Sequence, residues 1–177
     1  IKKTSVLEPI TANAYPFVIP KNWAWAYLND FGDWGSGSTP NRTNHEFYDG
    51  TIPWLKSGEL NDGIVSEAEE KVTELALEKC SLRFNKPGDV LFAMYGATVG
   101  KVAILGIEAT TNQAVCACTC FSGVFNRYLF LLLKAFKQQF INESAGAAQP
   151  NFSKDKIIRT IAPLPPLAEQ RRIVAKV

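Results

Sequence analysis

The sequence predicts an α+β domain in which a twisted, partly antiparallel sheet is flanked by helices. Three short apolar runs, Val90–Met94, Val99–Leu105 and Ala114–Cys120, have the length and boundaries of strands. The turn Tyr95-Gly96-Ala97-Thr98 between the first two runs predicts a hairpin. Asn126–Ser144 instead places its apolar residues at helical spacing and predicts the strongest helix of the chain.

The N-terminal part of the chain is expected to contribute a leader, one strand and a loop. Ile1–Pro20 contains three prolines and no periodic pattern, which predicts an extended leader. Lys21–Leu28 alternates aromatic and small residues, as a half-buried strand does. Phe31–Tyr48 is rich in glycine and in hydrogen-bonding side chains, and it predicts a loop that carries Arg42 as its fixed cation.

The middle of the chain predicts one further strand and one short helix. Ile52–Leu60 has the composition of a short strand, and its polar step places Lys56 and Ser57 where the strand becomes a loop. Glu67–Lys79 has apolar residues spaced as on a short amphipathic helix.

The C-terminal part predicts two helices around a last strand. Ser153 is suited to cap a short helix over Lys154–Arg159, and Thr160–Leu164 predicts a strand. The prolines Pro165-Pro166 then end that strand, and Leu167–Val177 begins a new helix. The chain starts on an isoleucine and stops inside this predicted helix, so we expect it to be a fragment of a longer protein.

Length and composition are those of one ordinary globular domain. The 177 residues suffice to bury a real core, and 46% of them are hydrophobic while 20% are charged. The net charge of +2 is too small to indicate nucleic-acid binding by itself, so a polyanion site would need clustered cations. No apolar run approaches the roughly 20 residues that span a bilayer. The sequence therefore predicts no membrane segment.

The four cysteines predict neither a metal site nor a disulfide framework. Cys116, Cys118 and Cys120 alternate along one predicted strand, which places all three on the same face. This spacing differs from the CxxC pattern of zinc knuckles and does not suit disulfides between neighbours. We expect small, buried side chains in a reducing cytoplasm.

Motifs for catalysis are missing or incomplete. Gly96–Lys101 resembles a phosphate-binding loop, but it is one residue too short, and Val102 replaces the hydroxyl that binds magnesium. The single histidine, His45, lies in a polar loop without a recognisable nucleophile partner. Glu69-Glu70-Lys71 matches a nuclease-like triplet that also arises on any charged helix face. The residues therefore predict a binding module that needs no cofactor or metal, and not an enzyme.

A family resemblance is carried by seven segments in a characteristic order and spacing. Together they resemble the target recognition domain of type I restriction–modification specificity subunits, over essentially Ile19 to Val177. The segments are Lys21–Trp25 (KNWAW), Gly37–Pro40 (GSTP), Ile52–Leu60 (IPWLKSGEL), Met94–Lys101 (MYGATVGK), Thr111–Ala114 (TNQA), Gln149–Asn151 (QPN) and Pro163–Val174 (PLPPLAEQRRIV).

The resemblance implies a role in sequence-specific DNA binding. In this family each recognition domain reads one half of a split double-stranded DNA site, and two long helices, packed as an antiparallel coiled coil, separate the two domains. Two methyltransferase subunits dock on the subunit and modify adenines in the half-sites, and the restriction subunit joins through the complex. By this resemblance, residues 1–20 are a leader, residues 21–164 form the recognition domain, and residues 165–177 begin a spacer helix through which a dimer is expected.

Residues suited to contact DNA gather in the predicted loops. Arginine, asparagine and glutamine pair with base edges in the major groove, whereas lysines are better suited to phosphates. The candidates are Arg42, Asn44, Lys56, Ser57, Tyr95, Thr98, Lys101, Asn112, Gln113, Gln149 and Asn151.

Several of these assignments have an alternative that the sequence leaves open. Arg42 is equally well explained as a solvated loop cation, and the amides of Asn112, Gln113, Gln149 and Asn151 as hydrogen bonds that fix loops. Because segments shared by domains that read different sequences are expected to be structural, we expect the choice of sequence to lie in 42–49 and 61–65. Two other functions are also open: the specificity segment of a single-chain restriction–methylation enzyme, and a protein-binding module unrelated to DNA.

Overall fold

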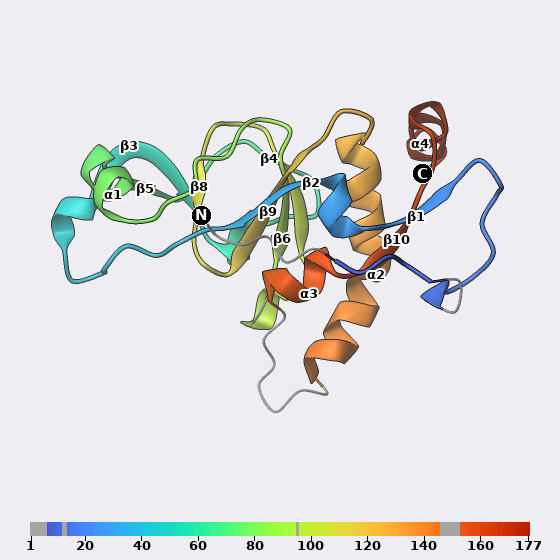
Figure 1. The fold of residues 1–177 in the computed structure, drawn as a ribbon. Coiled ribbons are helices and arrows are strands. Elements are labelled where there is room, and N and C mark those ends of the chain that lie inside the picture. Colours follow the sequence, from blue (N-terminus) through green and yellow to red (C-terminus); the bar gives the residue numbers. More distant parts are fainter. Residues whose placement is uncertain (1–6, 12–13, 95, 146–152) are drawn as a thin grey trace.

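A five-stranded sheet forms the centre of the computed structural model, which describes residues 7–11, 14–94, 96–145 and 153–177 (Figure 1). Its strands follow the order β2-β9-β6-β7-β4, and all neighbours are antiparallel except β4 and β7. The strand bounds are Gly32–Ser36 (β2), Ile64–Val65 (β4), Val90–Ala93 (β6), Val102–Leu105 (β7) and Val115–Cys120 (β9).

Both faces of the three central strands are covered, because the side chains of β6, β7 and β9 alternate between two apolar clusters. On β6, Phe92 belongs to the cluster beneath the helix α2 (Asn126–Ala145), whereas Leu91 belongs to the cluster on the opposite face. Cys116 and Cys118 lie in the first cluster, and Cys120 packs against it, as the alternating cysteines predicted. All four cysteines are free, which matches the prediction of small buried side chains for the three on this strand.

A second, three-stranded sheet lies beside the first, at the left of Figure 1. Its central strand β3 pairs antiparallel with β5 and parallel with β8, and Trp54 and Val72 fill its small core against the helix α1. The bounds are Tyr48–Leu55 (β3), Glu70–Val72 (β5), Glu74–Lys79 (α1) and Thr110–Thr111 (β8).

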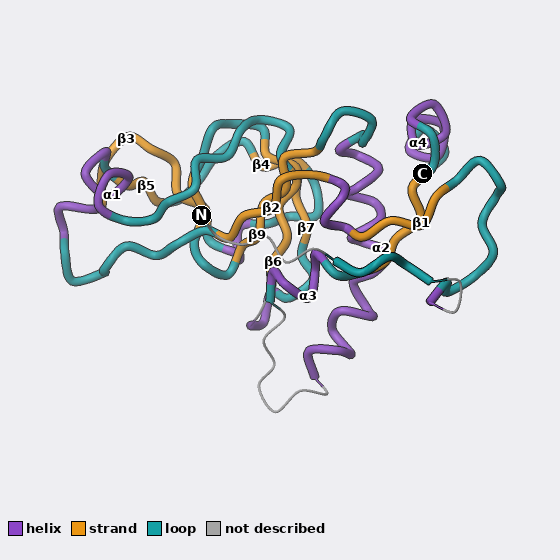
Figure 2. The backbone as a smooth tube through the Cα atoms, in the orientation of Figure 1, coloured by secondary structure: helices purple, strands orange, loops and turns teal. Residues whose placement is uncertain are grey.

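The C-terminal elements return to the first strand of the chain, at the right of Figure 2. The strands β1 and β10 form an antiparallel pair, and Ser153 caps α3 by accepting a hydrogen bond from the backbone N of Lys156. The helix α4 then packs on α2. The bounds are Ala24–Tyr27 (β1), Lys154–Ile158 (α3), Ile161–Leu164 (β10) and Leu167–Val174 (α4).

One buried side chain fastens α4 to the domain. Gln170 is fully buried. Its Oε1 accepts a hydrogen bond from the backbone N of Phe125 at 2.7 Å, and its Nε2 donates to the carbonyls of Gly123 at 2.9 Å and Pro165 at 2.8 Å. A glutamine in the first turn of a short helix thus satisfies three backbone groups, two of them in the loop before α2.

Several predicted elements have different bounds in the structure. The predicted strand Ile52–Leu60 is Tyr48–Leu55, because the chain makes a 3-10 turn at Ser57–Glu59. The predicted loop Phe31–Tyr48 contains the strand β2. This segment is a strand because it pairs with β9 along its whole length. The predicted helix Glu67–Lys79 begins only at Glu74, since residues 70–72 pair with β3. The predicted strand Val99–Leu105 begins at Val102, because the chain makes a 3-10 turn at Gly96–Thr98.

Neither a membrane span nor a metal cluster is found in the described part of the chain. None of its helices is long and apolar enough to cross a bilayer. Among the same residues, no three histidine, cysteine, aspartate or glutamate side chains are grouped as metal ligands.

Candidate nucleic-acid interface

Two parallel strands bring predicted site residues to a single edge. The pairs Trp54–Thr110 and Leu55–Thr111 align β3 with β8, so both strands end at the same place. The backbone N of Asn112 continues the pairing by donating to the carbonyl of Leu55 at 2.9 Å. Loops that leave the carboxyl ends of neighbouring parallel strands meet, and binding sites are often built from them. Residues 56–59 and 112–113 therefore lie side by side.

The turn that follows β6 adds a third loop to this edge. Thr98 donates a hydrogen bond to Ser57, with 2.9 Å between the two hydroxyl oxygens. The Nζ atom of Lys101 lies 3.3 Å from the carbonyl oxygen of Gly58. We call the surface formed by residues 56–59, 96–101 and 112–113 the recognition edge. Its three loops come from both sheets. Of the predicted site residues, Thr98 contacts Ser57 directly, and Lys101 contacts the backbone next to Ser57, which follows Lys56 in the chain.

The segment before β3 lies along the same edge. The backbone N of Ser38 donates to the carbonyl of Thr111 at 3.0 Å, and Trp54 donates from its indole to the carbonyl of Ser38 at 3.1 Å. The hydroxyl of Thr39 donates to the amide oxygen of Gln113. The approach is so close that a Cβ atom at Gly37 would lie 2.2 Å from the carbonyl oxygen of Thr111. Glycine at this position is therefore a requirement of the packing.

Arg42 projects from this segment and is fixed on three sides. Its guanidinium carbon lies 4.7 Å from the ring centroids of both Tyr48 and Trp54, within cation–π distance. Its Nη1 lies 2.5 Å from Oε2 of Glu70. The hydrogen bond from Arg42 is the main cause of a lowered pKa for Glu70, and that same bond raises the pKa of Arg42. Arg42 is thus a fixed cation and not a freely solvated one.

Lys56 shares the same carboxylate. Its Nζ atom lies 2.9 Å from Oε2 of Glu69 and 3.0 Å from Oε1 of Glu70. Hydrogen bonds to these two carboxylates, the one to Glu69 first, raise the pKa of Lys56. The positive charge expected at this end of the recognition edge is therefore balanced by two carboxylates in the free chain.

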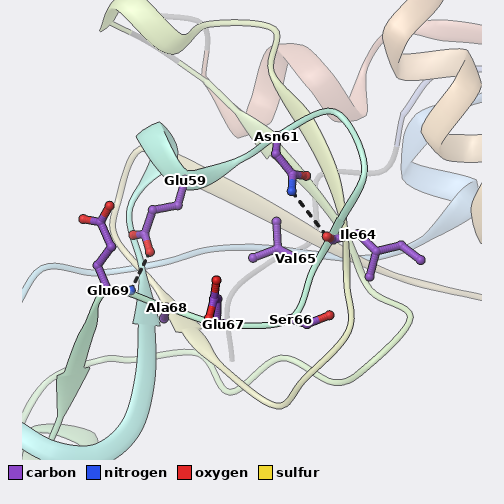
Figure 3. A pocket seen from close by; sticks show the side chains of 8 residues that line it. All are labelled: Glu59, Asn61, Ile64, Val65, Ser66, Glu67, Ala68 and Glu69. Carbon is purple, nitrogen blue, oxygen red and sulfur yellow. Dashed lines mark hydrogen bonds between the residues drawn. The ribbon is translucent and has the colours of Figure 1, made fainter.

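A third carboxylate joins the recognition edge to the segment that precedes β5. Glu59 accepts a hydrogen bond from the backbone N of Lys56 at 2.7 Å with one oxygen. Its other oxygen accepts from the backbone N of Glu69 at 2.8 Å, as Figure 3 shows. The sequence carried a signal for the first of these bonds, since a glutamate three residues after the start of a turn commonly bonds back to that start. The pairing with residue 69 had no such signal.

Beside Glu59 the surface is hollowed into a pocket with an acidic rim (Figure 3). The pocket has a volume of about 640 Å³ and is lined by Glu59, Asn61 and residues 64–69. Asn61 uses its side chain locally: its Nδ2 donates to the carbonyl of Ile64 at 3.3 Å, and its Oδ1 accepts from the backbone N of Gly63 at 3.0 Å. Because glutamates form its rim, the pocket is unsuited to phosphate.

The remaining predicted site residues divide into two groups. Asn44 and Asn112 both use their side-chain oxygens on nearby backbone N atoms, at 3.1 Å to Glu46 and 3.2 Å to Ala114. These are the loop-fixing roles that the sequence had left open for Asn112. Tyr95, Gln149 and Asn151 lie outside the described residues. Sequence reasoning missed the two acidic partners of Arg42 and Lys56, because it placed them in a helix.

Comparison with known proteins agrees with this architecture. The family described as the type I restriction modification DNA specificity domain matches residues 20–177. The type I restriction enzyme MjaIX specificity subunit of Methanocaldococcus jannaschii is 31% identical over 160 residues, which cover 88% of this chain and 37% of that subunit. The EcoR124I/EcoR124II specificity subunit of Escherichia coli is 24% identical over 85% of this chain and 39% of its own length.

Solved structures of the same kind share the fold. The HsdS subunit of Thermoanaerobacter tengcongensis aligns with a TM-score of 0.69 at 20% identity, over 91% of this chain and 37% of that one. A chain of a type I R-M system aligns with a TM-score of 0.71 at 23% identity, over 93% and 40% of the two chains. The chain thus spans well under half the length of these relatives. On the match over residues 20–177, it belongs to the family of type I restriction–modification DNA specificity domains.

Proposed function

We propose that this chain reads one half of a bipartite double-stranded DNA site within a type I restriction–modification complex. It contributes no catalysis itself and directs adenine methylation and restriction by partner methyltransferase and restriction subunits. Family membership supports this role, and the observation that carries it is the recognition edge. Three loops held by paired strands present hydroxyls, an amide and two lysines on one surface. Hydroxyls and amides are suited to base edges and lysines to phosphates, so such a surface can contact both at once.

Within this proposal, positioning and reading fall to different residues. Lys56 and Lys101 contact phosphates, because Lys56 comes directly after β3, Lys101 comes directly before β7, and both belong to the recognition edge. Arg42 reads a base: its guanidinium has five N–H donors, and the pairing with Glu70 uses only part of them. Gln113, whose side chain is exposed beside Thr39, is the second candidate for a base contact.

The helix α4 supplies the link to the rest of the assembly. It lies at the opposite end of the molecule from β3 and β5 (Figure 1), so a partner packed on it leaves the recognition edge open. Its outer face exposes Leu167, while Ile173 and Val174 pack inward on the main core. We propose that α4 begins the spacer on which a second recognition domain, or a second copy of this chain, is placed.

The relatives support a separate subunit in preference to a single-chain enzyme, because they are specificity subunits by name. A protein-binding module unrelated to DNA would have been favoured by a lack of positive charge at Lys56 and Lys101. The acidic partners of Lys56 reduce that charge in the free chain.

The test uses the assembled methyltransferase complex and the DNA it modifies. Sequencing of methylated adenines in cells that carry the intact system gives the half-site. Replacing Arg42 by alanine is then expected to cost roughly 1–3 kcal/mol of binding at one base pair and to relax the preference there. An Arg42→Ala complex that keeps its preference at every position would remove Arg42 from the readout. A complex whose modified sites do not change when this domain is exchanged would contradict the proposed function.

A further inference from the structure

Two cations of the proposed DNA surface are already bound to carboxylates in the free chain. Arg42 and Lys56 both contact Glu70, and Lys56 also contacts Glu69. The four side chains carry no net charge together, and all are accessible: the exposed fractions are 50% for Arg42, 32% for Lys56, 31% for Glu70 and 71% for Glu69. A DNA phosphate that approaches either cation therefore meets a carboxylate that holds it.

The backbone keeps these carboxylates in place. Glu70 belongs to β5 and pairs with Trp54 of β3, and the backbone N of Glu69 is held by Glu59. The backbone of both glutamates is therefore fixed, so their charges remain near this surface even when the side chains rotate. Exposed ion pairs are individually weak, however, and a phosphate oxyanion offers a cation the same kind of bond. Exchange of carboxylate for phosphate is therefore open to both Lys56 and Arg42.

Resting on the proposed function, we propose that Glu69 and Glu70 hold the phosphate-binding Lys56 and the base-reading Arg42 in ion pairs and thereby weaken the binding of both cations to phosphates of non-cognate DNA. On a non-cognate duplex, each phosphate that binds at this site must replace an existing ion pair and leave a carboxylate beside the duplex. On the cognate half-site, base contacts offset the same loss. The two glutamates thus lower non-specific affinity more than specific affinity, and they are specificity-determining residues that contact no base.

The effect is expected in the salt dependence as well as in the affinity. Each neutralised phosphate contributes about 0.9 to the slope of log K against log salt. When salt rises fourfold, from 50 to 200 mM, one additional neutralised phosphate therefore lowers the affinity by a further factor of about 3.5, which is four to the power of about 0.9. Arg42 remains stacked on Tyr48 and Trp54 after its carboxylate partner is neutralised, so the cation stays at the surface.

The experiment compares neutralised glutamates at the two ends of the molecule. The variants are Glu69→Gln and Glu70→Gln, and the control is Glu169→Gln. The control removes the carboxylate of an ion pair with Arg172 on α4, at the far end from β5 (Figure 1). All three substitutions change the net charge by the same amount and keep the size of the side chain. Each protein is titrated with a random-sequence duplex, alone and in the assembled methyltransferase complex, at four salt concentrations, after its thermal unfolding has been shown to match the parent.

We expect Glu70→Gln and Glu69→Gln to bind the random duplex several-fold more tightly than Glu169→Gln, with a salt slope steeper by up to about 0.9 for each further phosphate that the protein neutralises. Their ratio of cognate to random affinity in the complex is expected to fall. Equal behaviour of the three variants, or weaker binding by the first two, overturns the inference while the proposed function stands. A parent that binds no duplex in either form overturns both.

Discussion

Replacing Gln170 with methionine measures how firmly α4 is fastened to the recognition domain. The side chain is fully buried and forms three hydrogen bonds, with the backbone of Phe125, Gly123 and Pro165, at 2.7 to 2.9 Å. Methionine has nearly the same length and volume but can neither accept nor donate these bonds. The substitution therefore leaves three backbone groups without their partner, while it creates little empty space.

The expected cost follows from the number of bonds. A hydrogen bond inside a protein contributes roughly 0.5–1.5 kcal/mol to stability, and an unsatisfied buried partner costs more than that mean. Three bonds give about 3 kcal/mol of lost unfolding free energy. For a chain of this size, 1 kcal/mol corresponds to about 2–4 °C in the midpoint of thermal unfolding, so the midpoint should fall by about 6–12 °C.

Urea denaturation of the parent and of Gln170→Met gives the free energy directly, and amide exchange locates the loss. The matched control is Gln138→Met on α2, whose glutamine bonds to Asn142 of the same helix at the surface. The control should lie within about 0.5 kcal/mol of the parent, as exposed substitutions usually do. A loss below about 1 kcal/mol for Gln170→Met, or amide exchange in α4 as slow as in the parent, would show that apolar packing and not Gln170 holds the helix.

Three further outcomes are expected. Lys101→Ala should lower the salt slope of DNA binding by about one unit without changing base preference, whereas Lys134→Ala on α2 should leave the slope unchanged; titration against duplexes at several salt concentrations decides this. Gly37→Ala should lose about 1–3 kcal/mol in urea denaturation because its Cβ would overlap the backbone of β8, while Gly58→Ala, with open space around it, should lose far less. Burial raises the pKa of Cys116 from 9.0 to about 12, so the folded chain keeps a proton that the unfolded chain loses. The stability that this protonated thiol contributes is fully present below pH 9 and is lost as the pH rises toward 12, by about 1.4 kcal/mol per pH unit. Urea denaturation at several pH values under reducing conditions should therefore show a steeper fall of the unfolding free energy for the parent than for Cys116→Ala.

The central sheet and the long helix could be predicted because their signals are local. Three apolar runs bounded by glycine or polar steps form β6, β7 and β9, and Asn126–Ala145 has the helical spacing of a core-facing helix. The strands β2 and β5 were missed for one reason. Their sequences, GDWGS and EKV, are short and polar, and only pairing with β9 and β3 makes them strands. Pairing between distant segments leaves no periodic pattern in so few residues.

The candidate site could be predicted in part for a similar reason. Lys56, Ser57, Thr98 and Lys101 were recognisable as polar residues at the ends of apolar strands, and the structure brings them together. Residues 112 and 113 lie beside Lys56 and Ser57 because β3 and β8 run parallel. This pairing depends on the topology of the sheet, and no local pattern in the sequence indicates it. The acidic partners of Arg42 and Lys56 depend in turn on β5, which was not predicted as a strand. An error about one short strand therefore hid the charge balance of the whole surface.

In the segments that carry the family resemblance, four polar side chains form hydrogen bonds to the backbone. Trp54 donates to Ser38, Glu59 accepts from two backbone N atoms, Asn112 accepts from one, and Gln170 satisfies three backbone groups. Side chains used in this way fix the three loops and the helix relative to one another and are not available to bases. A subunit that must read different sequences on one scaffold needs such a division. Under the proposed function, the choice of bases would therefore fall to side chains that extend beyond this frame, and Arg42, which stacks on two rings and pairs with Glu70, is the first candidate that we propose.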